Sequence, residues 1–211
     1  MELEIKNNKV IVQNALNDGE FSNLKHIFYG YDIPWSYNDG IVNTENTSDF
    51  QFVHLVFDHS KAGYGPMWDS IIPILEKLTP SNVVRIKANL RPRTHEIETS
   101  DFHCDVWMPG ALTAIYYLDT NNGYTEFQDG DKITSIENQL VVFPSNLPHQ
   151  GTSCTDQNRR IVINFNFFPT TGLLNASGNI DSSVNAITDP LLSDTDKEYH
   201  KHWSKPMKSL L

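Results

Sequence analysis

The second half of the chain is dominated by short runs in which apolar and polar residues alternate. Alternation with a period of two predicts half-buried β-strands, because successive side chains of a strand point to opposite faces. Turn residues such as Asn, Asp and Gly separate the runs. The strands predicted in this way cover residues 83–90, 111–118, 124–127, 133–136, 139–143 and 160–168.

Regular short strands with turns between them predict a β-sandwich or a β-barrel. One such architecture is the double-stranded β-helix, a cupin-like jelly roll. The Asn-Asn-Gly of residues 121–123 predicts a hairpin, because Asn and Gly tolerate positive φ, and the Asp-Gly-Asp of residues 129–131 predicts a second turn. We therefore expect a mainly β fold with flanking helices, built as a double-stranded β-helix (jelly roll, cupin-like).

The first part of the chain carries the pattern of supporting elements. Apolar residues three and four apart predict a helix from about Glu20 to Phe28, with a start signal at residues 18–19, and a second helix over residues 66–78. Pro73 must then lie in the first turn of the second helix or kink it. The other elements expected here are a strand over residues 9–13, a loop over 29–50 and a strand over 50–57.

A length of 211 residues, with 39% hydrophobic and 20% charged residues, is typical of one globular domain with a sizeable core. We expect this single domain to span residues 1–211. Its supporting elements would occupy about 1–82, its β core about 83–168, and a polar extension 169–211. The last stretch, residues 196–211, fits a short helix.

The net charge of −10 means that the average field of the surface repels a phosphate backbone, so nucleic acid is an unfavourable partner. No apolar run reaches the length of a membrane span, and the first residues lack the pattern of a signal peptide. We therefore expect a cytoplasmic protein without a membrane partner, whose two cysteines, Cys104 and Cys154, are free thiols. The basic residues that would have to form a local patch are Arg85, Lys87, Arg91 and Arg93.

Three residues form a candidate metal site. His103 and Asp105 are one residue apart, so on a strand they share a face while Cys104 points away. His149 follows several strands later, and a β roll can return the chain beside its starting strand. Two imidazoles and one carboxylate make up the facial triad of non-haem Fe(II) oxygenases. Spacing alone leaves open the alternative that His149 lies in a surface loop.

The strand after His149 has one apolar and one polar face, and a guanidinium heads the polar face. An arginine there can hold a carboxylate through two parallel hydrogen bonds, although a solvated edge strand has the same pattern. Tyr116 and Tyr117 point to opposite sides of their strand, and a buried tyrosine hydroxyl needs a partner, which a bound carboxylate can supply. Asn89 lies on the strand that leads toward His103. The polar face holds Arg160, Val162, Asn164 and Asn166, and the apolar face holds Ile161, Ile163, Phe165 and Phe167.

This ordered set of motifs resembles the 2-oxoglutarate- and Fe(II)-dependent dioxygenases, in particular their prolyl-4-hydroxylase-like branch with its small bacterial and viral members. The resemblance covers roughly residues 83–168. A hairpin that often reads Gly-Gly-Glu-Thr in the family differs here at residues 122–126, and Cys104 between two ligands is unusual. The segments that carry the resemblance are Arg85–Leu90, Phe102–Asp105, Thr113–Leu118, Val142–His149 and Arg160–Phe165.

The resemblance implies an enzyme that uses Fe(II), 2-oxoglutarate and O2. The implied reaction hydroxylates a C–H bond, most simply in a prolyl residue of a protein or peptide, and converts 2-oxoglutarate to succinate and CO2. It also implies roles for named residues. His103, Asp105 and His149 would bind Fe(II); Arg160, or alternatively Arg159, would pair with the remote carboxylate of 2-oxoglutarate, with Tyr117, Asn89 and Asn164 as further cofactor-binding residues.

Alternatives remain at this point. The same cofactors can act on another amino-acid residue, a small metabolite or a nucleobase. A cupin-type metalloenzyme uses the same triad without 2-oxoglutarate, and a non-catalytic ligand-binding jelly roll uses neither. The arginine anchor separates these last two from the oxygenase hypothesis.

Overall fold

The structure is a computed structural model that describes residues 2–41, 49–61 and 67–170. The end of the chain, with the polar extension and the terminal helix expected over 196–211, lies outside the described residues from position 171 onward. Part of the loop expected over 29–50 also lies outside them.

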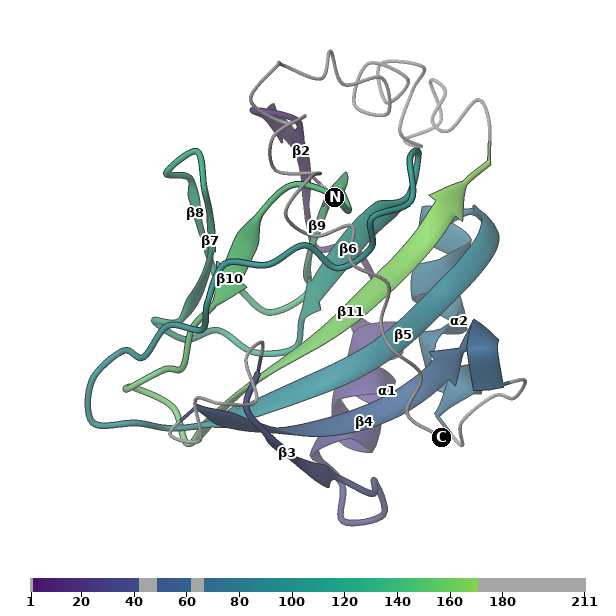
Figure 1. Cartoon of the computed structure of the whole chain (residues 1–211). Helices are drawn as coiled ribbons and strands as arrows, with labels where there is room; N and C mark the ends of the chain where they lie inside the picture. The colour runs from purple at the N-terminus through teal and green to yellow at the C-terminus, as the bar shows by residue number, and fades with distance from the viewer. Residues whose placement is uncertain (1, 42–48, 62–66, 171–211) are drawn as a thin grey trace, which may run out of the picture.

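The described residues form two antiparallel sheets, two α-helices and one short 3-10 helix, His59–Lys61. The large sheet has eight strands and the small sheet has three, and the small sheet stands to one side of the large one (Figure 1). The strands of the large sheet, in spatial order, are β1 (Glu2–Lys6), β2 (Lys9–Gln13), β9 (Gln139–Pro144), β6 (Leu112–Tyr117), β11 (Arg159–Pro169), β5 (Pro80–Pro92), β4 (Phe50–Asp58) and β3 (Ser36–Asp39). Those of the small sheet are β10 (His149–Gly151), β7 (Tyr124–Phe127) and β8 (Lys132–Thr134).

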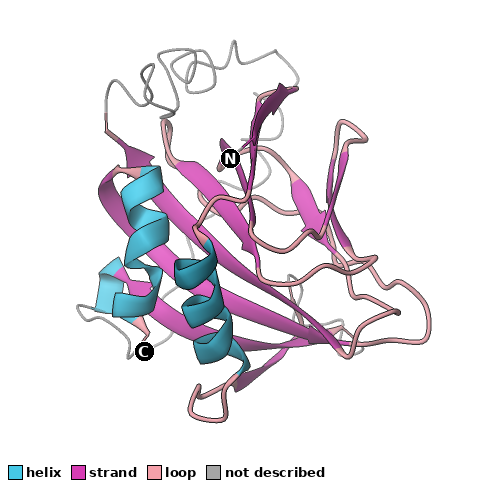
Figure 2. Cartoon of the chain, turned by 180° about the vertical axis from the view of Figure 1, so that it is seen from behind, coloured by secondary structure: helices cyan, strands magenta, loops and turns pink. Residues whose placement is uncertain are grey.

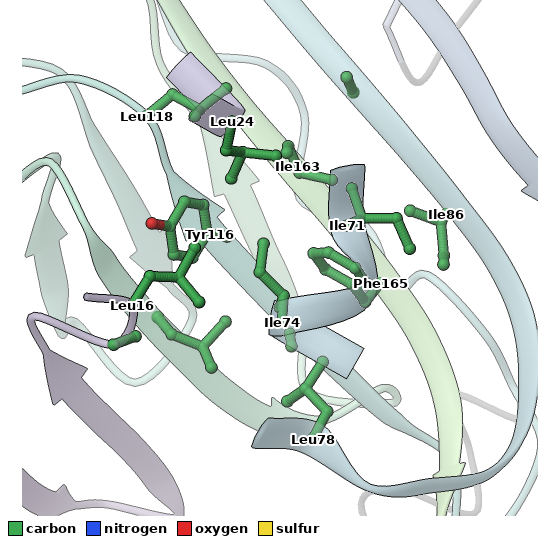
Figure 3. Close-up of a cluster of buried hydrophobic side chains, with 14 of the residues drawn as sticks. Leu16, Leu24, Ile71, Ile74, Leu78, Ile86, Tyr116, Leu118, Ile163 and Phe165 are labelled. Atoms are coloured by element: carbon green, nitrogen blue, oxygen red, sulfur yellow. The ribbon is translucent and has the colours of Figure 1, made fainter. Parts of the chain in front are cut away.

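Both helices, α1 (Asp18–Tyr29) and α2 (Trp68–Leu78), cover the same face of the large sheet (Figure 2). Apolar side chains of the helices, such as Leu24 and Ile74, meet the sheet residues Tyr116 and Phe165 in a buried cluster (Figure 3). The opposite face of the large sheet packs on the small sheet in a second cluster. Its buried members are Ile11, Ile115, Tyr117, Phe127, Ile133, Val141, Phe143 and Val162.

The strand that carries the candidate arginine has the predicted two faces. Ile161 and Ile163 belong to the helix-side cluster, and Val162 belongs to the cluster between the sheets. Tyr116 and Tyr117 likewise belong to different clusters. The alternation of side chains along a strand therefore directs the polar face of β11 into the space between the two sheets.

The helices differ from expectation in detail. α1 begins after Asn17, whose side chain accepts from the backbone N–H of Glu20 (2.9 Å), while the Glu20 carboxylate accepts from the N–H of Asn17 (3.1 Å). This reciprocal pair is a capping box, so the start signal is Asn17 rather than residues 18–19. Pro73 lies in the second turn of α2, which overturns the first of its two predicted alternatives, a place in the first turn. The loop expected over 29–50 contains the edge strand β3.

The prediction of a hairpin at residues 121–123 is wrong. β6 pairs with β9 and β11, whereas β7 pairs with β8 and β10, so this segment carries the chain from one sheet to the other. The backbone N–H of Asn122 donates to the carboxylate of Asp156 (3.0 and 3.1 Å), which holds the crossing against a later loop. The turn at residues 129–131 does link the antiparallel pair β7 and β8, with Gly130 at φ 90°.

Candidate functional site

Backbone pairing brings the two candidate histidines together. His103 and His149 form an isolated antiparallel bridge, in which each N–H donates to the other residue's carbonyl oxygen at 3.0 Å. Their ring centroids lie 4.8 Å apart. His149 opens β10, whereas His103 lies in a segment that is not a continuous strand. The single bridge is enough to align the rings, and the thiol of Cys104 turns to the carbonyl oxygen of Asn146 (3.2 Å).

Asp105 completes the group. The ligand atoms of His103, Asp105 and His149 all lie within 4.8 Å of one another. Nδ1 of His103 lies 3.2 Å from the carbonyl oxygen of Asp101, and Nδ1 of His149 lies 3.0 Å from that of Leu147. Because a carbonyl oxygen only accepts, both Nδ1 atoms carry a proton, so in a neutral ring the lone pair is on Nε2, the atom that can bind a metal. Two imidazole nitrogens and a carboxylate oxygen of this arrangement fit one divalent metal ion.

The three groups perturb one another. Burial acts to raise the pKa of Asp105, but the hydrogen bond with His149 and the charges of both imidazoles outweigh it and hold this pKa well below its usual range. Burial acts to lower the pKa of His149, and the Asp105 carboxylate reverses the effect, so the pKa of His149 is raised. The pKa of His103 is lowered, first by burial and then by His149. A positive charge beside Asp105 is therefore favoured.

Neighbouring polar side chains hold the carboxylate of Asp105. Its Oδ2 accepts from Oγ1 of Thr113 (3.1 Å) and from Nδ2 of Asn164 (3.0 Å), and its Oδ1 lies 3.6 Å from Nη2 of Arg85. Thr113 was not singled out in the sequence. The signal was present, since Thr113 is a lone polar residue on the same strand face as Ile115 and Tyr117.

The triad opens into a cavity between the two sheets. His103, Asp105 and His149 line one part of it, and Arg160 lines another. Ile115 and Val162 supply apolar wall. The other polar lining side chains include Lys87, Asn89, Arg91 and Asn164.

Arg160 is 4% exposed and is held by neutral groups. Its Nε donates to Oγ of Ser135 (2.7 Å), its Nη2 to Oγ1 of Thr125 (3.3 Å), and its Nη1 to the carbonyl oxygen of Thr152 (3.4 Å). Within the described residues, no carboxylate forms an ion pair with this guanidinium. A buried guanidinium whose hydrogen-bond acceptors are all neutral, with Asp119 acting only from beyond ion-pair distance, gains from a further anion, so this part of the cavity is suited to a carboxylate.

The sequence matches no family model, and no curated protein matches it. A prolyl hydroxylase from Trichoplax adhaerens, in complex with a hypoxia inducible factor oxygen degradation domain peptide fragment, superposes with a TM-score of 0.58 at 14% identity, over 78% of this chain and 84% of that one. An oxidoreductase of the 2OG-Fe(II) oxygenase family from Burkholderia pseudomallei gives 0.57 at 11% identity, over 76% and 85%. The chain has the fold of the 2-oxoglutarate- and Fe(II)-dependent oxygenases.

A third structure with this oxygenase fold is HygX from Streptomyces hygroscopicus with nickel, 2-oxoglutarate and hygromycin B bound. Its TM-score is 0.50 at 8% identity, over 78% of this chain and 84% of that one. The expected jelly-roll fold class is confirmed, and the expected enzyme class and cofactors agree with the activities and ligands for which these structures are named. At identities this low, the superpositions establish the fold alone.

Within the oxygenase fold, the two candidate arginines lie on opposite sides of β11. Arg160 lines the cavity, whereas the guanidinium carbon of Arg159 lies 4.1 Å from the ring centroid of Tyr29, and that ring packs on the helix-side core. This placement favours Arg160 as the anchor.

The other cofactor-binding candidates take different positions. Tyr117 is fully buried, its hydroxyl donates to Oγ1 of Thr125 (2.9 Å), and its ring centroid lies 5.6 Å from the guanidinium carbon of Arg160. Asn89 lines the cavity, and its buried Oδ1 has no hydrogen-bond partner in the part of the chain that the structure describes. Asn164 also lines the cavity while its Nδ2 binds Asp105. In the same described part, no helix is long and apolar enough to cross a membrane, and both cysteines are free thiols, as expected.

Proposed function

We propose that this chain is a single-domain dioxygenase that uses Fe(II), 2-oxoglutarate and O2 to hydroxylate a C–H bond. The most direct candidate substrate is a prolyl residue of a protein or peptide, with 2-oxoglutarate converted to succinate and CO2. One observation carries the proposal. The His103, Asp105 and His149 cluster shares its cavity with a buried arginine that has no anionic partner within the described residues.

His103, Asp105 and His149 would together hold the iron. Nδ1 of each histidine is engaged by a backbone carbonyl, which fixes the ring orientation. Thr113 and Asn164 hold the carboxylate of Asp105 in place. When bound, iron and 2-oxoglutarate supply the oxidising chemistry with O2, and the protein supplies orientation and exclusion of water.

Arg160 would pair with the remote carboxylate of 2-oxoglutarate. Ser135 and Thr125 fix its guanidinium before any ligand arrives. Tyr117 would act beside it, since Thr125 accepts from both the Tyr117 hydroxyl and the guanidinium. Asn89 lines the same cavity, and its Nδ2 would donate to the same ligand.

Support for a prolyl substrate comes from the sequence resemblance and from the prolyl hydroxylase among the similar structures. A small molecule is the second candidate, supported by the similar structure that has hygromycin B bound. Both candidates use the same metal and cosubstrate site.

Anaerobic titration of the protein with Fe(II) and 2-oxoglutarate tests the cofactors. We expect the weak visible charge-transfer band of the metal chelate. Absence of this band, with both components present in excess, would contradict the oxygenase proposal and favour a ligand-binding jelly roll. Incubation of loaded enzyme with prolyl peptides, followed by mass spectrometry for the gain of one oxygen atom, then tests the substrate class.

A further inference from the structure

Three cations line the cavity, and they differ in how they are paired. Nη2 of Arg91 lies 2.6 Å from Oδ1 of Asp49, so Arg91 already has its counterion. Arg160 is held by neutral groups and is assigned above to the cosubstrate. Lys87 lines the same cavity, and no residue of the described chain forms a hydrogen bond or ion pair with its ammonium group. The ammonium of Lys87 is therefore available to a ligand.

The register of the large sheet places Lys87 at the metal end of the cavity. On β5 and β11, Lys87 lies opposite Asn164, whose amide binds the Asp105 carboxylate. Arg160 lies opposite Arg91, four residues further along, which corresponds to about 13 Å of strand. Lys87 and Arg160 therefore lie at opposite ends of the cavity.

The charge balance of the cavity distinguishes Lys87 from the other two cations. The two positive charges of Fe(II) would be balanced by the Asp105 carboxylate and one carboxylate of 2-oxoglutarate. The second carboxylate of 2-oxoglutarate would be balanced by Arg160. The loaded cavity then keeps the positive charge of Lys87, and Arg85, whose Nη2 lies 3.6 Å from Oδ1 of Asp105, adds to the positive field. Burial lowers the pKa of Lys87, and Arg85 lowers it further, while Asp105 raises it. A half-buried cation of this kind is stabilised by an anion.

We propose that Lys87 binds a carboxylate of the primary substrate, close to the C–H bond that reacts. The substrate would then be acidic near its target carbon, for example a peptide with an aspartyl or glutamyl residue next to the modified one. A point charge with three donors suits a carboxylate that arrives in more than one orientation. The inference rests on the proposed function, because it assumes that iron and 2-oxoglutarate occupy the rest of the cavity.

The test measures binding without turnover. Wild-type protein, Lys87→Met, Lys87→Arg and, as a matched control at the exposed end of α2, Lys77→Met are loaded anaerobically with Fe(II) and 2-oxoglutarate. Two peptide pairs are then titrated while the chelate band is monitored. One pair is acetyl-aspartyl-proline amide and acetyl-asparaginyl-proline amide, and the other has alanine in place of proline.

We expect the aspartyl member of at least one pair to bind wild-type protein about tenfold more tightly than its asparaginyl partner, as a charge-assisted hydrogen bond provides. The preference should disappear in Lys87→Met and persist in Lys87→Arg and Lys77→Met. The inference would be overturned if wild-type protein bound the aspartyl and asparaginyl peptides equally, or bound none of the four peptides. A preference for the aspartyl peptide that persists in Lys87→Met would also overturn it. So would a loss of 2-oxoglutarate affinity in Lys87→Met, since Lys87 would then serve the cosubstrate.

These outcomes are separable from failure of the proposed function. If wild-type protein forms no chelate band, the oxygenase proposal fails and this inference fails with it. If the band forms and an acid preference appears only in the alanine pair, Lys87 keeps its role and the prolyl substrate is excluded.

Discussion

Gly123 lies against the side chain of Arg160. A Cβ atom at position 123 would stand 2.7 Å from Cδ of Arg160 and 2.5 Å from the carbonyl oxygen of Ser153. The first contact would push an arginine whose guanidinium is already fixed by Ser135 and Thr125. Glycine is therefore needed here for space, because the crossing between the sheets passes directly over the predicted anchor of 2-oxoglutarate.

We expect Gly123→Ala to displace Arg160 and weaken 2-oxoglutarate binding about tenfold, with overpacking lowering the free energy of unfolding by about 1–3 kcal/mol. Anaerobic titration and chemical denaturation measure the two effects. Gly19→Ala is the control, since its Cβ would meet nothing closer than Oδ1 of Asn17 at 3.4 Å. Wild-type 2-oxoglutarate affinity in Gly123→Ala would show that a Cβ atom at position 123 does not displace the guanidinium of Arg160.

Periodicity predicted the parts of the fold that depend on local pattern. β2 has the predicted bounds, and the two faces of β11 separate into two clusters, because side-chain alternation on a central strand directly determines burial. The same reasoning placed Tyr116 and Tyr117 on opposite faces. The candidate metal ligands were singled out because three residue types with strong chemistry occurred in the order of a known motif, and the structure brings the three side chains together.

The remaining features depend on contacts between distant segments. β10 has only three residues and exists because β7 pairs with it, and the bridge from His103 to His149 joins segments that no local pattern connects. The segment over 121–123 has the composition of a hairpin, yet its turn chemistry serves a crossing between sheets. Ser135 gave no signal as a partner of Arg160, since a serine at the end of a short strand is typical of any exposed turn.

Arg160 and Arg159 provide a matched pair of variants. We expect Arg160→Met to raise the dissociation constant for 2-oxoglutarate by roughly 10–100-fold, which corresponds to about 1.5–3 kcal/mol for lost charged hydrogen bonds. Fe(II) should still bind, because the triad is untouched. Arg159→Met removes the same charge from the side that faces Tyr29 and should leave 2-oxoglutarate affinity unchanged. The reverse result would make Arg159 the anchor.

The triad predicts loss of metal on removal of any ligand. We expect Asp105→Ala and His103→Ala each to weaken Mn(II) or Fe(II) binding by more than about 100-fold, since loss of even an outer partner typically costs about 10–100-fold. Equilibrium dialysis under anaerobic conditions measures this, and succinate formation should vanish in parallel. Asp101→Asn is the control, because the backbone carbonyl of Asp101, and not its carboxylate, contacts His103. Full metal binding in Asp105→Ala would exclude this site.

A charged cluster at the turn between β7 and β8 predicts an acid-dependent stability. Hydrogen bonds from Lys6, and then from Lys9, lower the pKa of Asp131 below its usual value. A carboxyl whose pKa is lower in the folded state stabilises the protein above its unfolded pKa, near pH 4, and loses this contribution as pH falls through the folded pKa.

We therefore expect Asp131→Asn to lower Tm at pH 7, and the difference from wild type to shrink below about pH 4. Thermal unfolding of both proteins at several pH values measures this difference in Tm. The exposed Asp32 is the control position, and Asp32→Asn should leave Tm unchanged at every pH. A difference in Tm for Asp131→Asn that stays constant down to low pH would show that the Asp131 charge makes no contribution.

Thr113 connects Asp105, the candidate metal ligand, to the sheet. It lies on β6, its Oγ1 donates to Asp105, and the same oxygen accepts from Nδ2 of the fully buried Asn166 (3.1 Å). Thr113→Val keeps the shape of the side chain but leaves that amide unpaired. We expect it to lower the free energy of unfolding by about 1–3 kcal/mol and to weaken metal binding by at least about tenfold.

Thr113→Ser keeps the hydroxyl and should retain most of both properties. Denaturation and anaerobic metal titration of the two variants separate the hydroxyl from the methyl group of Thr113. If Thr113→Val binds metal as tightly as wild type, then the remaining partners of Oδ2 of Asp105, among them Asn164, are sufficient to orient the carboxylate. A loss of stability without a loss of metal affinity would assign Thr113 to the fold alone.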